Sequence, residues 1–310
     1  MLRHGLLWLS ERRGVYNFVR RNRLAWRMAS RFVAGEAVED AVQVALNLRT
    51  RDIGATVDFL GESVAAPPAA LAARDKYLAI LDQLHTENLE VNVSVKLTQM
   101  GFDIDENLCA SNVCAIATRA KEHGGFVRID MESSEYTQRT LDLYRTRVAP
   151  QFGNCVGVVI QSALRRSADD IQQLIDEGVR VRLCKGAYLE PQDVAFPKKA
   201  DVDANFVALM ERLLLKGNHP AIATHDERII RHAQHFASQH GIAADRFEFQ
   251  MLYGVRRDLQ QQLRAGGAGV RVYIPFGSQW YPYLMRRLAE RPSNVAFMVG
   301  NIMREMWPRS

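Results

Sequence analysis

Short apolar runs rich in β-branched residues alternate along this chain with longer amphipathic stretches. Eight runs have the length of a strand, and each is followed by a segment with helical periodicity. The runs are Ala55–Leu60, Val91–Leu97, Phe126–Met131, Val156–Gln161, Val179–Cys184, Ala221–His225, Arg246–Leu252 and Val270–Ile274. Eight strands alternating with helices predict an α/β fold, a closed parallel (βα)8 barrel of the TIM type.

The amphipathic stretches predict the helices around that barrel, one before the first strand and one after each strand. They are Glu36–Leu48, Leu71–Leu84, Ala110–His123, Tyr136–Arg147, Ala168–Glu177, Asp201–Lys216, Glu227–His240, Arg256–Arg264 and Tyr281–Glu290. No linker, low-complexity segment or fixed-period repeat interrupts the pattern. We therefore expect one barrel domain over residues 49–310, preceded by a helical arm over residues 1–48.

Two local patterns suggest other kinds of site but lack the required context. The glycines at 266, 267 and 269 precede a strand, whereas a dinucleotide-binding glycine loop follows a strand and opens a helix. His232 and His235 share a predicted helix, but no carboxylate or cysteine completes a metal site there. We expect neither a Rossmann domain nor a metal centre.

The net charge of +5 is concentrated at the N-terminus. Residues 1–35 hold eight arginines and one glutamate, a charge of +7, which leaves the remaining 275 residues at −2. The arm also carries apolar residues such as Trp8 and Trp26, and this composition fits three roles: a cap over one end of the barrel, contact with an anionic membrane surface, or an organellar transit peptide. The cap is favoured, since apolar residues at helical spacing usually pack.

No apolar run approaches the roughly 18 residues needed to cross a membrane. The four cysteines show no CxxC pairing, so we expect neither disulfides nor thiolate metal sites, and a reducing compartment. The predicted location is the cytoplasm, with peripheral contact at the inner face of the cell membrane left open.

Polar side chains near the carboxyl ends of the predicted strands are the candidate functional residues. They are Lys96, Asp130, Gln161, Arg182, Lys185, His225, Gln250 and Tyr273. A salt bridge or hydrogen bond in the top layer of the barrel would account for any single one. It accounts poorly for all eight together, so we expect chemistry at this end.

A second cluster lies on the helix predicted after the eighth strand. Tyr283, Arg286 and Arg287 are spaced i, i+3 and i+4, and so share one helical face. Two adjacent guanidinium groups repel unless an anion lies between them, and each matches a carboxylate with two hydrogen bonds. A solvated basic face is the alternative, but the position at the catalytic end of the barrel favours an anion clamp.

These blocks resemble the proline dehydrogenase family. The matching segments are Ser-Val-Lys-Leu-Thr (94–98), Arg-Ile-Asp-Met-Glu (128–132), Arg-Leu-Cys-Lys-Gly-Ala-Tyr (182–188), Ala-Thr-His-Asp (223–226), Glu-Phe-Gln-Met-Leu-Tyr-Gly (248–254), Val-Tyr-Ile-Pro-Phe-Gly (272–277) and the helix at 283–290. The resemblance spans residues 50 to 300 and is to the short monofunctional bacterial form. It implies a barrel that binds FAD, oxidises L-proline to Δ1-pyrroline-5-carboxylate by hydride transfer to flavin N5, and passes electrons to a membrane quinone.

The resemblance also implies roles for individual residues. Substrate would be bound by Lys96, Leu252, Tyr273, Tyr283, Arg286 and Arg287, with the two arginines and Lys96 on the proline carboxylate. Asp130 and Arg182 would be the catalytic residues: Asp130 orienting the cationic network, and Arg182 beside flavin N5, where a cation stabilises the reduced form. FAD would be held by Met131, Gln161, Arg182, Lys185, Gly186, Ala187, Tyr188, Thr224 and His225. Whether Asp130 also accepts the amine proton stays open.

Two other functions remain as alternatives. A barrel lyase would form a Schiff base on Lys96 or Lys185, although such a lysine usually lies in an apolar pocket rather than among arginines. A membrane- or nucleic-acid-binding protein would work through the basic arm, but the −2 charge of the rest of the chain argues against nucleic acid as a partner. The sequence does not set the oligomeric state.

Overall fold

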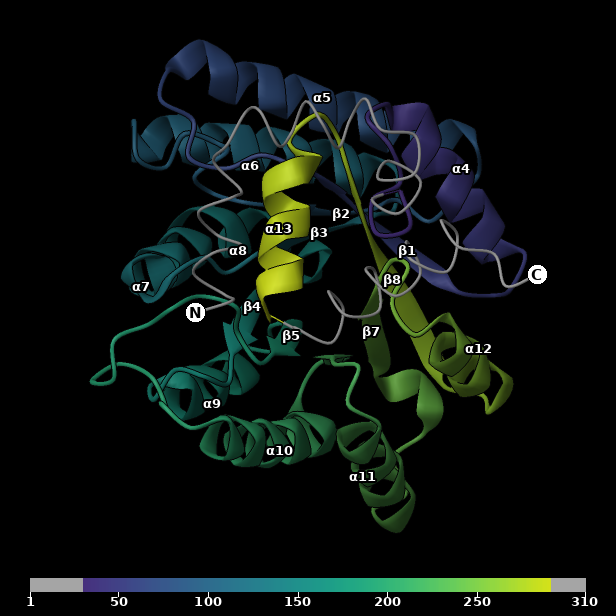
Figure 1. The fold of residues 1–310 in the computed structure, drawn as a ribbon. Helices are drawn as coiled ribbons and strands as arrows, with labels where there is room; N and C mark the ends of the chain where they lie inside the picture. The colour runs from purple at the N-terminus through teal and green to yellow at the C-terminus, as the bar shows by residue number, and fades with distance from the viewer. Residues whose placement is uncertain (1–29, 291–310) are drawn as a thin grey trace, which may run out of the picture.

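A closed barrel of eight parallel strands forms the centre of the molecule, with helices around it (Figure 1). The computed structural model describes residues 30–290, with the backbone alone from 286 to 290. Each strand pairs with its sequence neighbours, and β8 (Gly269–Phe276) closes the barrel against β1 (Gly54–Phe59). The predicted α/β barrel of the TIM type is confirmed. The basic arm up to residue 29 lies outside the described residues.

The other six strands match the predicted runs in order and differ mainly at their ends. They are β2 (Asn92–Val95), β3 (Phe126–Ile129), β4 (Val156–Gln161), β5 (Val181–Cys184), β6 (Ala221–Ala223) and β7 (Glu248–Leu252). Lys96 and Asp130 therefore come directly after their strands rather than within them. All eight pairings are parallel, so the carboxyl ends meet at one end of the barrel.

Each predicted helix is present. The long ones are α4 (Val38–Arg49), α5 (Pro67–Thr86), α6 (Glu106–Glu122), α7 (Ser134–Leu143), α9 (Ser167–Asp176), α10 (Lys199–Lys216), α11 (Glu227–Gln239), α12 (Arg257–Ala265) and α13 (Trp280–Glu290). After α7 come the short segments η1 (Tyr144–Val148), α8 (Ala149–Phe152) and η2 (Gly153–Cys155), and η3 (Ala244–Arg246) precedes β7. Helix α6 begins four residues before its prediction, because the Asp105 side chain accepts hydrogen bonds from the first turn.

Side chains along each strand alternate between the helices outside the barrel and the barrel interior. On β2 and β3, Val93 is aligned with Val127, and both belong to the apolar core under the helices. The next aligned pair, Ser94 and Arg128, is buried inside the barrel, where Ser94 contacts Arg182 from β5. The outer face of the sheet is thus aliphatic, whereas the interior is polar.

Two segments hold the carboxyl end of β8 in place. Helix α4 packs against β1 and β8, and its apolar side chains join the common core. The chain just before α4 then contacts the start of α13: the amide of Gly277 donates to the carbonyl of Gly35 at 2.9 Å, and Trp280 Nε1 donates to Glu36 Oε1 at 3.0 Å. Helix α13 crosses the end of the barrel that faces the viewer in Figure 1.

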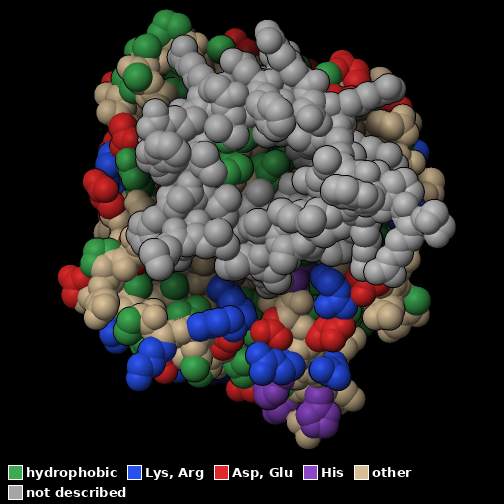
Figure 2. All heavy atoms as spheres, viewed as in Figure 1, with side chains coloured by type: hydrophobic (Ala, Val, Ile, Leu, Met, Phe, Trp, Pro, Cys, Tyr) green, Lys and Arg blue, Asp and Glu red, His purple; other side chains and the backbone are tan. Residues whose placement is uncertain are grey.

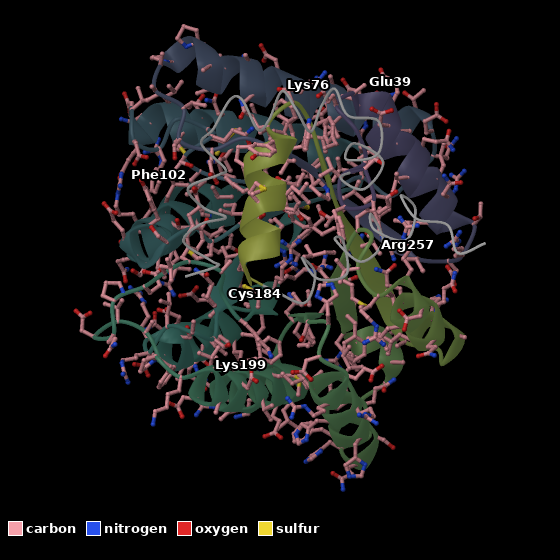
Figure 3. The ribbon with its side chains drawn as sticks, viewed as in Figure 1. Glu39, Lys76, Phe102, Cys184, Lys199 and Arg257 are labelled. Atoms are coloured by element: carbon pink, nitrogen blue, oxygen red, sulfur yellow. The ribbon has the colours of Figure 1, made fainter. Side chains whose placement is uncertain are left out.

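The outer helices carry charges of both signs. Over α10 and α11, basic and acidic side chains are interspersed on the described part of the face in Figure 2, and histidines gather over α11. Figure 3 gives the same view with sticks: Cys184 marks the end of β5 near the centre, while Glu39, Lys76, Lys199 and Arg257 lie on the surrounding helices. Among the described helices, none is both long and apolar enough to cross a membrane.

Candidate active site

The carboxyl end of the barrel holds a lysine paired with a buried acid. Lys96 Nζ lies 3.0 Å from Oδ1 of Asp58, a fully buried residue of β1. Burial alone would lower the pKa of Lys96, but the negative charges of Asp58 and Asp130 outweigh it and raise that pKa above its ordinary value. Lys96 is therefore a fixed cation.

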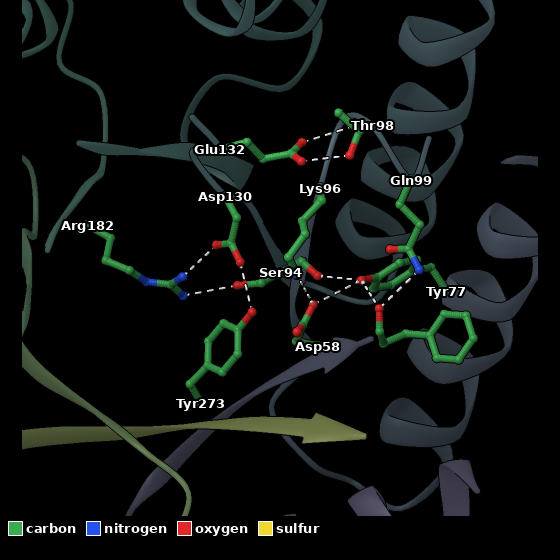
Figure 4. A network of polar contacts seen from close by, with 11 residues as sticks. Asp58, Tyr77, Ser94, Lys96, Thr98, Gln99, Asp130, Glu132, Arg182 and Tyr273 are labelled. Atoms are coloured by element: carbon green, nitrogen blue, oxygen red, sulfur yellow. Dashed lines mark hydrogen bonds and ion pairs between the residues drawn. The ribbon is translucent and has the colours of Figure 1, made fainter. Parts of the chain in front are cut away.

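Arg182 is the centre of a second network, and Figure 4 shows its contacts with Asp130 and Ser94 beside the first network. Its Nη1 donates to Asp130 Oδ1 at 2.7 Å, its Nη2 donates to Ser94 Oγ at 3.1 Å, and its Nε donates to the Gln250 side-chain oxygen. The guanidinium thus has three acceptors, from β2, from β7 and from the residue that follows β3. Three hydrogen bonds to one planar group fix the orientation of the guanidinium plane.

Tyr273 joins this network from β8. Its hydroxyl donates to Asp130 Oδ2 at 2.9 Å, and the Arg182 guanidinium lies over its ring, 5.4 Å from the centroid. Burial and the negative charge of Asp130 raise the pKa of Tyr273 well above its ordinary value, so the phenol stays protonated. Both oxygens of Asp130 are therefore occupied by donors, which suits an orienting carboxylate.

Gln161 and Glu132 form a neighbouring polar group at the ends of β3 and β4. Gln161 Nε2 donates to the carbonyl of Glu132 at 2.8 Å. The Glu132 carboxylate accepts from the amide of Thr98 at 3.1 Å and from its hydroxyl at 2.7 Å. These bonds fix the amide of Gln161 and tie the loops after β2 and β3 together.

The loop after β5 requires a glycine next to Gln161. Gly186 has φ +100°, and a Cβ there would lie 3.0 Å from Gln161 Oε1 and 3.2 Å from Ala163 Cβ. Lys185, the preceding residue, pairs with Asp203 at 2.6 Å and with Asp226 at 3.3 Å. The loop continues through Ala187 to Tyr188, which is exposed. Backbone rather than side chain therefore faces the strand ends at Gly186.

Four further predicted residues lie at or just after the ends of β3, β6 and β7. Thr224 is buried, and its hydroxyl accepts from the amide of Asp226 at 3.1 Å. His225 Nε2 accepts from the amide of Leu252 at 2.9 Å, which places the proton of a neutral ring on Nδ1. Met131, after Asp130, is buried.

The predicted anion clamp is only partly described. Tyr283 is buried on α13, and it lies close enough to Tyr273 to contribute to the raised pKa of that phenol. The side chains of Arg286 and Arg287 lie outside the described residues, although both belong to α13. The backbone of α13, which includes both positions, crosses the end of the barrel.

Sequence reasoning missed Asp58 and left Ser94 without a role. Asp58 is the one acid in the run Ala55–Leu60, and it is in register with Ser94, two residues before Lys96. A lone acid in a strand that is otherwise apolar was the available signal. Gln250 is one of the predicted polar residues, but no sequence pattern indicates that it binds Arg182.

The arrangement is suited to holding an anion and stabilising negative charge. Lys96 and Arg182 are fixed cations, while Asp130 is engaged on both oxygens. A Schiff-base lysine must reach its neutral form, and the raised pKa of Lys96 opposes this. The ion pair of Lys96 with Asp58 therefore disfavours a lyase that works through Lys96.

Comparison with known proteins gives a consistent result. The family profile for proline dehydrogenase matches residues 41–299. Proline dehydrogenase of Deinococcus radiodurans is 43% identical over 307 residues, covering 98% of each chain. Proline dehydrogenase 1 of Bacillus subtilis subsp. natto is 39% identical, covering 98% of this chain and 100% of its own length.

Solved structures with this fold include longer proteins. Proline utilization A from Bdellovibrio bacteriovorus, crystallised after inactivation by N-propargylglycine, superposes with a TM-score of 0.80 at 28% identity. The match covers 89% of this chain and 34% of that one. The present chain thus corresponds to about a third of that larger protein.

Proposed function

Because this chain belongs to the proline dehydrogenase family, we propose that it oxidises L-proline to Δ1-pyrroline-5-carboxylate, with hydride passing to bound FAD and electrons passing on to a membrane quinone. Its enzymatic activity is that of a proline dehydrogenase in proline catabolism. The proposed chemistry rests mainly on two fixed cations at the strand ends. Lys96 forms an ion pair with Asp58, and Arg182 forms one with Asp130.

The substrate carboxylate is bound by Lys96 together with Arg286 and Arg287. A cation whose pKa is raised by a buried partner keeps its charge throughout the working pH range, so it attracts the carboxylate of proline continuously. Tyr273 and Tyr283 pack against the pyrrolidine ring and exclude water, and Leu252 adds an apolar contact with the ring. Asp130 orients this network.

The residues beside the carboxylate site fit a flavin. At Gly186 the backbone is bare, and a Cβ would lie tightly against Gln161 Oε1, at 3.0 Å. A planar ring system can approach such a bare backbone closely. Gln161, Met131 and Arg182 would contact the ring, while Lys185, Ala187, Tyr188, Thr224 and His225 would hold the ribityl chain and phosphates. When bound, FAD supplies the hydride acceptor, and Arg182 stabilises negative charge at its N5 edge.

The location of the enzyme follows from its electron acceptor. A membrane quinone requires the protein to reach the bilayer surface from the cytoplasm, and the basic arm of residues 1–35 is suited to an anionic surface. Deleting residues 1–29, which keeps the contact of Gly35 with Gly277, should abolish salt-sensitive binding to anionic vesicles and leave dye-linked proline oxidation intact. Binding that survives the deletion would remove the arm from this role.

The absorption spectrum of the purified protein tests the central proposal. We expect a yellow protein with flavin absorption that proline bleaches, and proline-dependent reduction of an artificial dye. A colourless protein that reduces no dye after FAD is added would overturn the proposal. A lysine adduct trapped by borohydride would support the lyase instead.

A further inference from the structure

A line of polar side chains runs through the barrel from Arg182 toward the amino ends of the strands. Arg182 Nε donates to Gln250 Oε1, and Gln250 Nε2 donates to Glu248 Oε1. Glu248 then accepts from Arg271 Nε, at 3.0 Å to each oxygen. Glu248 and Gln250 are two residues apart on β7, so both point into the barrel, and both are buried.

The amide of Gln250 has one orientation that satisfies both neighbours. Its oxygen must face the Arg182 guanidinium, which only donates, and its NH2 must face the Glu248 carboxylate, which only accepts. Turning the amide over would press an NH2 group against a cation and an oxygen against an anion. Glu248 thus selects the face that Gln250 presents to Arg182.

Glu248 is itself held as an anion. Burial would raise its pKa, but the charge and hydrogen bonds of Arg271 outweigh this and lower the pKa of Glu248 to about 2. Arg271 is anchored in turn by Glu90, at 2.8 and 2.9 Å, and by the carbonyl of Ala55 at 2.8 Å. The selection of the amide orientation therefore does not change across the pH range in which an enzyme works.

We propose that Glu248 is a positioning residue of the active site, which acts on Arg182 through Gln250. Asp130 and Ser94 bind the two Nη groups of Arg182, and Gln250 supplies the third restraint, at Nε. Together they set the direction in which the guanidinium faces the flavin. This inference rests on the proposed role of Arg182 beside flavin N5.

The test is the variant Glu248→Gln. A glutamine at 248 can present either its oxygen or its NH2 group to Gln250, so both orientations of the Gln250 amide become accessible. We expect the rate of flavin reduction by proline to fall roughly tenfold, the size of weakening one hydrogen bond to a charged group. The flavin potential should become more negative, because the reduced form loses a well-directed cation. The dissociation constant of proline should change less than about twofold, since other residues hold the carboxylate.

Two further variants separate positioning from stability. Glu90→Gln removes a charge from the outer end of the same network without touching Gln250, so it should leave the reduction rate and the potential unchanged. If Glu248→Gln leaves Arg271 too poorly paired for folding, the double variant E248Q/R271M removes both charges, which proteins tolerate better. It should show the same slow reduction and the same shift in potential.

The outcomes distinguish this inference from the proposed function. If the wild-type protein binds no flavin or is not reduced by proline, the proposed function fails. If the wild type is reduced normally and the folded Glu248 variants match it in rate and potential, only the positioning role is overturned. Equal rate losses in the Glu90 and Glu248 variants would also overturn it, because that would indicate general destabilisation.

Discussion

At the scale of single residues, the hydroxyl of Tyr273 is a test of how Asp130 works. It donates to Asp130 Oδ2 at 2.9 Å, and it stays protonated. In Tyr273→Phe that oxygen loses its donor, so we expect kcat/KM for proline to fall roughly tenfold, with FAD retained. The control is Tyr136→Phe, which removes an equivalent hydrogen bond, 2.8 Å to exposed Asp103, and should leave activity unchanged. Similar losses in both variants would remove this role from Tyr273.

The arginines of α13 give a second test at the residue scale. Replacing Arg286 or Arg287 with Met removes a cation from the proposed carboxylate clamp, so KM for proline should rise at least tenfold, while FAD content changes little. Steady-state kinetics and the flavin absorption of the purified variants measure the two effects. Arg74→Met is the matched control, because among the described residues Arg74 pairs with its neighbour Asp75 alone, on the surface of α5. Equal losses of proline and flavin affinity would mean that α13 presents a different face.

At the scale of elements, the loop after β5 depends on Gly186. Alanine there must adopt φ +100° and place its Cβ 3.0 Å from Gln161 Oε1. Gly267→Ala is a matched control, since Gly267 has φ +85° but its Cβ position has no neighbour within 4 Å in the described part of the chain. Both variants should lose about 1 kcal/mol of stability from backbone strain. Only Gly186→Ala should also lose flavin, as measured by cofactor content, and equal flavin content in the two would contradict the proposed cradle.

The elements were the part of the structure that sequence could predict best. Outward residues such as Val93 and Val127 pack under the helices, so the runs are apolar enough to mark strands. The residues at which the strands end were harder to predict. For example, β2 ends at Val95, and the next residue, Lys96, forms an ion pair with Asp58. Helix starts depended on caps: Asp105 accepts hydrogen bonds from the first turn of α6, which periodicity alone does not reveal.

At the scale of the whole molecule, closure of the barrel decides which polar residues meet. Asp58 lies on β1 and Lys96 directly follows the neighbouring β2. Arg182, in contrast, contacts Ser94 and Asp130 across the interior, 88 and 52 residues away in sequence. A list of strand ends predicts which residues reach the mouth. It does not predict the partners, because these depend on the register between strands and on the side chains that fill the interior.

The buried pair of Glu248 and Arg271 should make the stability of the whole barrel sensitive to acid. The pKa of Glu248 is about 2 in the folded protein, below its ordinary value of 4.5, so its stabilisation is complete above pH 4.5 and is lost as pH falls toward 2. In that window the unfolded chain binds one more proton at this site, which adds about 1.4 kcal/mol per pH unit to the slope of the unfolding free energy. The double variant E248Q/R271M should lack this part of the slope, while Glu90→Gln should keep it, when urea unfolding is measured from pH 6 to about 3. If the free energy of unfolding falls with pH in the same way for the wild type and the double variant, Glu248 has the same pKa in the folded and unfolded chains. The interior ion pair would then not make the barrel sensitive to acid.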